Sequence, residues 1–190
     1  MTNAISDYQE ITRETSGCDD IHVLALGLIG ETAELIDECR HFSKVSGMRP
    51  LTKTISLVSK ELGDVCWYSA RIFDILGYRF KDWHRISCPN SKSQPGSFTV
   101  TDEHMLGMLK KAAWVSEHVK KHVGHGHNLE KLKIVDKVAE LVRDVESISQ
   151  TIYGPNGLNI VIEKNVVKLR KRYPNGFSKD KSVNRDNDDV

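Results

Sequence analysis

The sequence predicts an all-α fold, and three observations support this prediction. Apolar residues recur at spacings of three and four through most of the 190-residue chain, which is the helical period. Beta-branched residues do not form alternating runs, so we expect no sheet. Glycine and proline gather at a few breaks between the long periodic segments. The chain is therefore expected to fold as five or six helices.

The first half of the chain contains three of these helices. They are expected over about 4–15, 19–44 and 52–76, followed by one helical turn at 78–83. Asp19 and Asp20 are candidate N-caps of the second helix, and the segment 46–50, which contains glycine and proline, ends it. Gly77 is a typical stop for the third helix.

The second half follows a segment rich in proline, glycine, serine and asparagine. Three further helices are expected over about 102–123, 129–153 and 158–172. We predict a catalytic helical half at 1–86, a linker at 87–98, a second helical half at 99–178 and a disordered polar tail at 179–190.

The two halves share a rhythm of long helix, short loop, long helix and glycine break. The sequence from Glu61 to Val65 partly matches the sequence from Glu140 to Val145. Two interpretations stay open. The second half is a degenerate repeat that has lost its site, or any two helical hairpins would look this similar.

Composition indicates a soluble globular protein. Hydrophobic residues make up 39% and charged residues 28%, and the formal net charge is only +1. There is no apolar run of the roughly 20 residues that cross a bilayer and no signal peptide pattern, so we expect a cytoplasmic protein with no membrane association. The four cysteines are widely spaced and are expected to be reduced thiols. The small net charge favours a small anionic ligand over a nucleic acid.

Two pairs of acids stand three residues apart on successive predicted helices. Glu31 and Glu34 form the first pair, and Glu61 and Asp64 form the second. Residues at this spacing share one face of a helix, and apolar residues flank both pairs. Two helices joined by a short loop pack antiparallel, which can bring all four carboxylates together.

Four converging carboxylates would need a cation. Oxygen ligands without cysteine or clustered histidine favour Mg²⁺, with Mn²⁺ as a possible substitute, and such sites suit phosphate chemistry. One pair of this kind commonly lies on a solvated helix face. Two pairs with apolar flanks favour a site, as does Gly63, because glycine inside a helix usually marks the close approach of another group.

The motifs GETAELID and KELGDVCWYSARI resemble the E-x-x-E and E-x-x-D signature of the all-α NTP pyrophosphohydrolases, which include MazG-like proteins, dimeric dUTPases and dCTP pyrophosphatases. The run from Lys164 to Phe177 resembles the N-x-x-K-L-x-x-R-Y-P-x-G-F element of MazG-like chains, and the Tyr8-Gln9 pair also suits the family. The resemblance covers about 5–83 and 158–178, and the stretch from about 87 to 153 departs from the shortest members.

This resemblance implies a MazG-like helical bundle that hydrolyses nucleoside triphosphates to nucleoside monophosphates and diphosphate. Glu31, Glu34, Glu61 and Asp64 would hold one to three Mg²⁺ ions, and one of the outer glutamates would hold the attacking water. The role would be control or house-cleaning of the nucleotide pool. A homodimer or tetramer is expected to complete the pocket, unless the second half is a degenerate copy that covers the first within one chain.

Substrate contacts are expected from the last helix and from one aromatic residue. The helix can present cations and an amide to phosphate oxygens, through Lys164, Asn165, Lys168 and Arg172. Tyr68 lies four residues after Asp64 on the same face, where related enzymes use an aromatic against the base. Trp67 is expected in the core.

Two other functions stay open, and one metal site is set aside. The basic run from Lys164 to Arg172 could instead bind nucleic acid, although aromatics for stacking are sparse there. The chain could also be an inactive helical interaction protein. His118 and His122 have metal-ligand spacing, but lysines separate them and we expect a solvated helix end.

Overall fold

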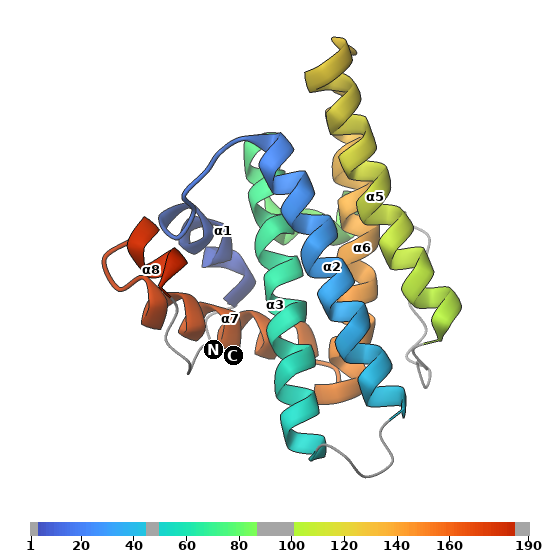
Figure 1. Cartoon of the computed structure of the whole chain (residues 1–190), viewed down its shortest axis with the longest axis vertical. Coiled ribbons are helices and arrows are strands. Elements are labelled where there is room, and N and C mark those ends of the chain that lie inside the picture. The colour runs from blue at the N-terminus through green and yellow to red at the C-terminus, as the bar shows by residue number, and fades with distance from the viewer. Residues whose placement is uncertain (1–3, 45–49, 87–100, 185–190) are drawn as a thin grey trace.

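The computed structural model describes residues 4–44, 50–86 and 101–184, and eight α-helices lie within these ranges (Figure 1). The long helices are α2 (Ile21–Lys44), α3 (Leu51–Ile75), α5 (Asp102–His125) and α6 (Lys131–Tyr153). The shorter ones are α1 (Ala4–Glu14), α4 (Trp83–Ile86), α7 (Gly157–Arg172) and α8 (Lys179–Val183), with a 3-10 turn, η1, at Phe80–Asp82. This part of the chain contains no strand, so the all-α prediction is confirmed.

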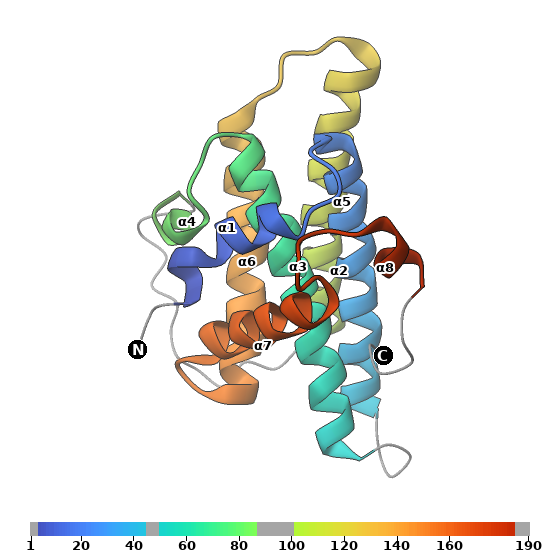
Figure 2. The same cartoon turned by 90° about the vertical axis from the view of Figure 1, so that its left-hand side faces the viewer.

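The four long helices stand side by side as a bundle. Helix α2 packs against α3 and α5, and α6 packs against the same two helices from the other side. Helices α1 and α7 cross one side of α3, as Figure 2 shows. None of the helices in the described ranges is both long and apolar enough to cross a membrane. The arrangement leaves α7 positioned over the middle of α3.

One large hydrophobic core extends through both halves of the chain. Leu62 and Phe73 of α3 belong to the same fully buried cluster as Val138 and Leu141 of α6. The hairpin of α5 and α6 therefore shares its packing with the hairpin of α2 and α3. The predicted linker at 87–98 lies outside the described residues.

The helix ends follow local signals, which is why the predicted bounds of the six longer helices are correct to within two residues. The Thr101 hydroxyl accepts a hydrogen bond from the His104 backbone N–H and caps the start of α5. Gly77, at φ +85°, directly follows Leu76, the C-cap of α3, and stops the helix as predicted.

The polar tail departs from its prediction. Ser178 caps a short helix, α8, by accepting a hydrogen bond from the Lys181 backbone N–H. The prediction of a disordered tail from residue 179 is therefore wrong for Lys179–Val183. The composition of these residues is polar, but the Ser178 cap stabilises the start of a short helix. Residues 185–190 lie outside the described part of the chain.

Helix α1 is held against α3 by a polar network centred on Asp74. The guanidinium of Arg13 contacts Asp74 at 2.5 Å, and that of the buried Arg71 contacts the same carboxylate at 2.6 Å. These two guanidinium groups hold the pKa of Asp74 below its usual range, the hydrogen bond from Arg13 being the largest cause. The Gln9 amide donates to Asp74 and to the Tyr78 carbonyl, each at 2.9 Å. Helix α1 is thereby fixed beside the middle of the bundle.

Two acids of the second half, Glu140 and Asp144, have basic neighbours within its hairpin. Glu140 pairs with Lys137 at 2.7 Å, and Asp144 pairs with Lys111 at 2.5 Å and with His104 at 3.2 Å. These acids are neutralised within their own hairpin. This arrangement is consistent with a second half that lacks a metal cluster, and a duplication stays a prediction.

Helix α7 approaches α3 closely at Gly63. A Cβ atom placed on Gly63 would lie 2.8 Å from both Cβ and Nδ2 of Asn165. Any larger residue would force the two helices apart, because the nearest atom belongs to the base of the Asn165 side chain. The prediction that Gly63 marks a close approach is confirmed.

We expect Gly63→Ala to destabilise the fold by about 1–3 kcal/mol, the usual cost of overpacking a well-packed contact. The matched control is Gly107→Ala in α5, where an added Cβ meets nothing within 4 Å. That change should stabilise the protein by about 0.5–1 kcal/mol, because alanine is the better helix former. Urea unfolding checks both values, and equal effects of the two changes would contradict the close approach.

Candidate active site

Three carboxylates converge between α2 and α3. Glu31 and Glu34 come from α2 and Glu61 from α3, and each offers an oxygen that lies within 4.8 Å of the others. The two helices run antiparallel from their short connection, so acids at three-residue spacing on each helix meet across the same groove (Figure 1). The predicted convergence is found for these three acids.

Glu61 is the buried member of the cluster. Its side chain is only 5% exposed, and its Oε1 atom accepts a hydrogen bond from Lys60 at 3.1 Å. Its Oε2 atom is buried and has no hydrogen-bond partner among the residues that the structure describes. An unsatisfied carboxylate oxygen beside two further carboxylates is costly unless a cation or proton completes it. The donor set and the orphaned oxygen both fit a hard divalent cation such as Mg²⁺ or Mn²⁺.

Burial and the neighbouring carboxylates raise the pKa of Glu31 and of Glu61. Burial, together with repulsion from Asp64, Glu34 and Glu61, raises the pKa of Glu31 to about 7. Burial also raises the pKa of Glu61, and the hydrogen bond from Lys60 opposes that rise. A cation bound at this site would have to displace a proton from Glu31 near neutral pH.

Asp64 lies next to the cluster but faces α7. Its Oδ1 atom accepts hydrogen bonds from the ammonium of Lys168 and, at 3.0 Å, from the Nδ2 atom of Asn165. The structure thus brings together three of the four predicted acids directly, while Asp64 links them to α7. The approach of α7 at Gly63 brings two donors, Asn165 and Lys168, to the Asp64 carboxylate.

The four predicted contacts of α7 divide into three groups. Arg172 lines the pocket beside the acids, and Lys168 reaches Asp64. Asn165 is buried, 4% exposed, and supports Asp64 from behind. Lys164 is directed elsewhere, because its ammonium donates to the Tyr153 hydroxyl at 2.6 Å and lies 4.5 Å from the centre of that ring. Lys164 is therefore not placed at the acids.

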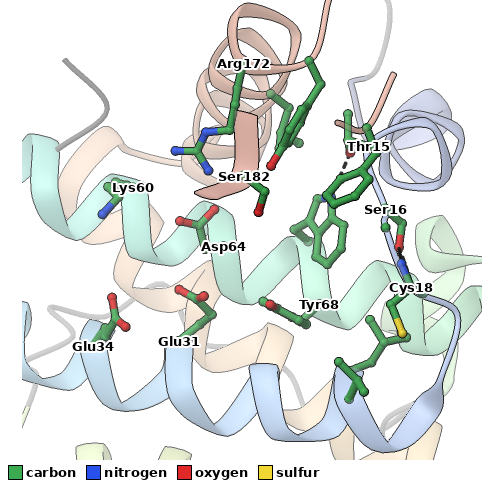
Figure 3. A pocket seen from close by; sticks show the side chains of 17 residues that line it. Thr15, Ser16, Cys18, Glu31, Glu34, Lys60, Asp64, Tyr68, Arg172 and Ser182 are labelled. Atoms are coloured by element: carbon green, nitrogen blue, oxygen red, sulfur yellow. Dashed lines mark hydrogen bonds between the residues drawn. The ribbon is translucent and has the colours of Figure 1, made fainter. Parts of the chain in front are cut away.

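A cavity of about 380 Å³ opens over the acids. Figure 3 shows Glu31, Glu34 and Asp64 at one end, with Lys60 and Arg172 beside them. The other end is lined by aromatic and small residues, which are Trp67, Tyr68, Tyr173, Phe177 and the loop 15–18. The pocket thus has a charged end and an aromatic end.

Tyr68 belongs to this pocket, as predicted, because α2 leaves room for its ring. A Cβ atom on Gly27 would lie 2.1 Å from the Tyr68 ring, so only glycine permits the ring to lie against α2. Trp67 packs against the core, as predicted, but its side chain is only partly buried and also lines the pocket. Its indole N–H donates to the Thr15 hydroxyl at 3.0 Å, which turns the ring toward the loop after α1.

Several pocket residues were missed in the sequence. The loop 15–18 and the segment after α7 meet where the Phe177 N–H donates to the Glu14 carbonyl at 3.0 Å. The Phe177 ring lies against Gly17, 2.3 Å from where a Cβ atom would be. Ser182 of α8 completes this wall. The only available signals were Gly17 and the aromatic residues of the YPNGF run, and neither shows by itself that the two segments meet.

Comparison with known proteins yields no relative. No family model, no curated protein and no solved structure matches the chain. The arrangement of charges in the pocket is therefore the basis for any statement about activity.

We expect the metal-free protein to lose stability as pH rises from about 5 to about 8. A carboxyl group whose pKa is raised in the folded state keeps its proton there after the unfolded chain has released it, so stability falls between the unfolded pKa and the folded value of about 7. Urea unfolding in EDTA measures this loss. Adding Mg²⁺ or Mn²⁺ at pH 8 should restore stability, because the cation replaces the proton.

Glu31→Gln provides the control for that measurement. The amide does not titrate. Without metal, the difference in the free energy of unfolding between the wild-type protein and Glu31→Gln should therefore be close to zero at about pH 5 and largest at about pH 8. Two results together would contradict the proposed metal site. The stability of the wild-type protein relative to Glu31→Gln would not change between about pH 5 and about pH 8, and divalent cations would not raise it.

Proposed function

We propose that this chain is a Mg²⁺-dependent nucleoside triphosphate pyrophosphohydrolase that converts a (d)NTP and water to a (d)NMP and diphosphate. The observation that carries the proposal is the convergence of three carboxylates within 4.8 Å beside a pocket that also contains a guanidinium group. Carboxylates that hold a divalent cation, facing a positively charged side chain, suit a substrate with several phosphates.

Each end of the pocket matches one part of such a substrate. Glu31, Glu34 and Glu61 would hold the metal, and Asp64 would stand between them and α7. When bound, the cation would activate water and offset the charge on the phosphate oxygens. Arg172 lies where it can bind a phosphate through its guanidinium fork, and Lys168 is a second cation within reach. These groups would hold the triphosphate against the acids.

The aromatic end suits a nucleoside. The cavity is lined there by the aromatic rings of Trp67, Tyr68 and Phe177. Any of the nucleobases can stack favourably on such rings. Thr15 and Ser16 also line this end, but their hydroxyls already donate to the backbone carbonyls of Ile11 and Cys18, so toward a ligand they could only accept. A substrate lying along the pocket would extend from this end to the acids, with the bond between its α- and β-phosphates broken by water.

The hairpin of α5 and α6 is relevant to whether the pocket needs a second copy of the chain. Helix α5 packs on α2 and helix α6 packs on α3, so the second hairpin covers faces of the first hairpin within one chain. This arrangement favours the alternative in which the second half covers the first. A homodimer or tetramer stays a prediction, which light scattering tests. Action in the cytoplasm also stays a prediction. A panel of dNTPs and NTPs would identify the preferred base.

Binding of nucleic acid by α7 is the less favoured function. Two of the α7 cations are directed toward the acids or the pocket, and Lys164 is engaged by Tyr153. Few of them are left to form a continuous basic surface. An inactive interaction protein would not need an orphaned carboxylate oxygen at Glu61.

We expect release of diphosphate from (d)NTPs that requires Mg²⁺ and falls by at least about 100-fold in Glu34→Gln and in Asp64→Asn, the usual scale for removing a group that stabilises charge in the reaction. A coupled phosphate assay after added pyrophosphatase measures the rate, and circular dichroism verifies the fold. The matched control is Glu140→Gln in the second half, which should keep wild-type activity because Glu140 pairs with Lys137 away from the pocket.

Activity that survives both substitutions would reject this site. Salt-dependent binding of oligonucleotides, unchanged by the two substitutions and without hydrolysis, would indicate a nucleic-acid module. An inert scaffold would show neither activity.

A further inference from the structure

Tyr8 of α1 lies outside the pocket but is hydrogen-bonded to the machinery behind it. The side chain is completely buried, and its hydroxyl lies 2.7 Å from Oδ1 of Asn165 and 3.2 Å from the Gly63 carbonyl. The hydroxyl thus contacts α7 and α3 where Asn165 lies close against Gly63. A tyrosine placed only for packing would need one partner for its hydroxyl, and this one has two on different helices.

The hydrogen bond to Asn165 fixes which way the Asn165 amide points. The hydroxyl donates to Oδ1, so Nδ2 faces the other direction, where it donates to Oδ1 of Asp64 at 3.0 Å. The opposite orientation would place an amide oxygen against a carboxylate oxygen, and neither group could donate. Burial and the charge of Asp64 raise the pKa of Tyr8 well above its ordinary value, so the hydroxyl keeps its proton.

The bond from Asn165 affects how Asp64 is presented to the other acids. Asn165 and Lys168 both donate to Oδ1 of Asp64, and in the described part of the chain Oδ2 has no hydrogen bond of its own. Oδ2 is left as the acceptor that a cation or a water can use. A partner that holds a ligand in this way commonly changes metal affinity or activity about 10–100-fold when it is removed.

We propose that Tyr8 is a positioning residue, which acts through the Asn165 amide to hold the Asp64 carboxylate in its working orientation. This inference rests on the proposed function of the site. Without the Tyr8 hydroxyl, Oδ1 of Asn165 loses its partner in a buried position, the amide is free to turn over, and the donor to Asp64 is lost.

The test is Tyr8→Phe, which keeps the ring and removes the hydroxyl. We expect kcat for diphosphate release to fall about tenfold while KM stays within about twofold, because the substrate does not contact Tyr8. Mn²⁺ binding in the absence of nucleotide, followed by electron paramagnetic resonance, should weaken by a similar factor. Tyr153→Phe is the matched control, since it removes another hydroxyl that bonds Ser59 and Lys164 and should leave both quantities unchanged.

A double-mutant cycle distinguishes positioning from simple loss of stability. In an Asn165→Ala background, Tyr8→Phe should cause no further loss of kcat or Mn²⁺ affinity, because its effect passes through that amide. Losses that add in the double variant, or a Tyr8→Phe protein with wild-type kcat and Mn²⁺ affinity, would overturn the proposal. If Tyr8→Phe does not fold, wild-type values in Asn165→Ala alone would overturn it.

Failure of the proposed function would look different. A wild-type protein that releases no diphosphate, but whose Mn²⁺ affinity falls in Tyr8→Phe only when Asn165 is present, would reject the reaction and support the positioning.

Discussion

The repulsion among acids between α2 and α3 is the constraint on which the rest of the site depends. Two unit charges 4.8 Å apart repel by about 3.5 kcal/mol at an effective dielectric constant of about 20. Three ionised carboxylates at this spacing need a proton or a cation, and the raised pKa of Glu31 reflects the first solution. Hydrogen-bond donors of the described residues do not neutralise the cluster completely, because Oε2 of Glu61 has no donor among them. The bundle therefore holds these groups in a state that a divalent cation would relieve.

Helix α7 supplies the second part of the site from a distant part of the sequence. It can reach Asp64 only because Gly63 has no side chain, which brings Asn165 and Lys168 to the acids. Helix α1 supports this contact through Tyr8, and the Asp74 network holds α1 in place. The functional residues are thus divided among α2, α3 and α7, and the bundle sets their relative positions.

Much of the fold follows from local sequence signals, and the composite site follows from them only in part. Helical periodicity and stop signals such as Gly77 locate the long helices, and acids at three-residue spacing predict one shared face. Contacts between segments distant in the sequence set the rest. Spacing alone placed Lys164 beside Lys168, but Tyr153 engages Lys164. The apolar neighbours of Trp67 in the sequence predicted a core residue, and they do not show the hydrogen bond to Thr15 that directs its indole toward the pocket.

The central claim is that Glu31, Glu34 and Glu61 form a divalent-metal site at the charged end of one nucleotide pocket. Anomalous X-ray scattering from crystals grown with Mn²⁺ and a dNTP that carries an uncleavable α,β-imido bridge tests this claim most directly. We expect a manganese peak bounded by oxygens of all three glutamates, with the triphosphate toward Arg172 and the base toward Tyr68. A nucleotide bound elsewhere, or no manganese peak between α2 and α3, would contradict the account.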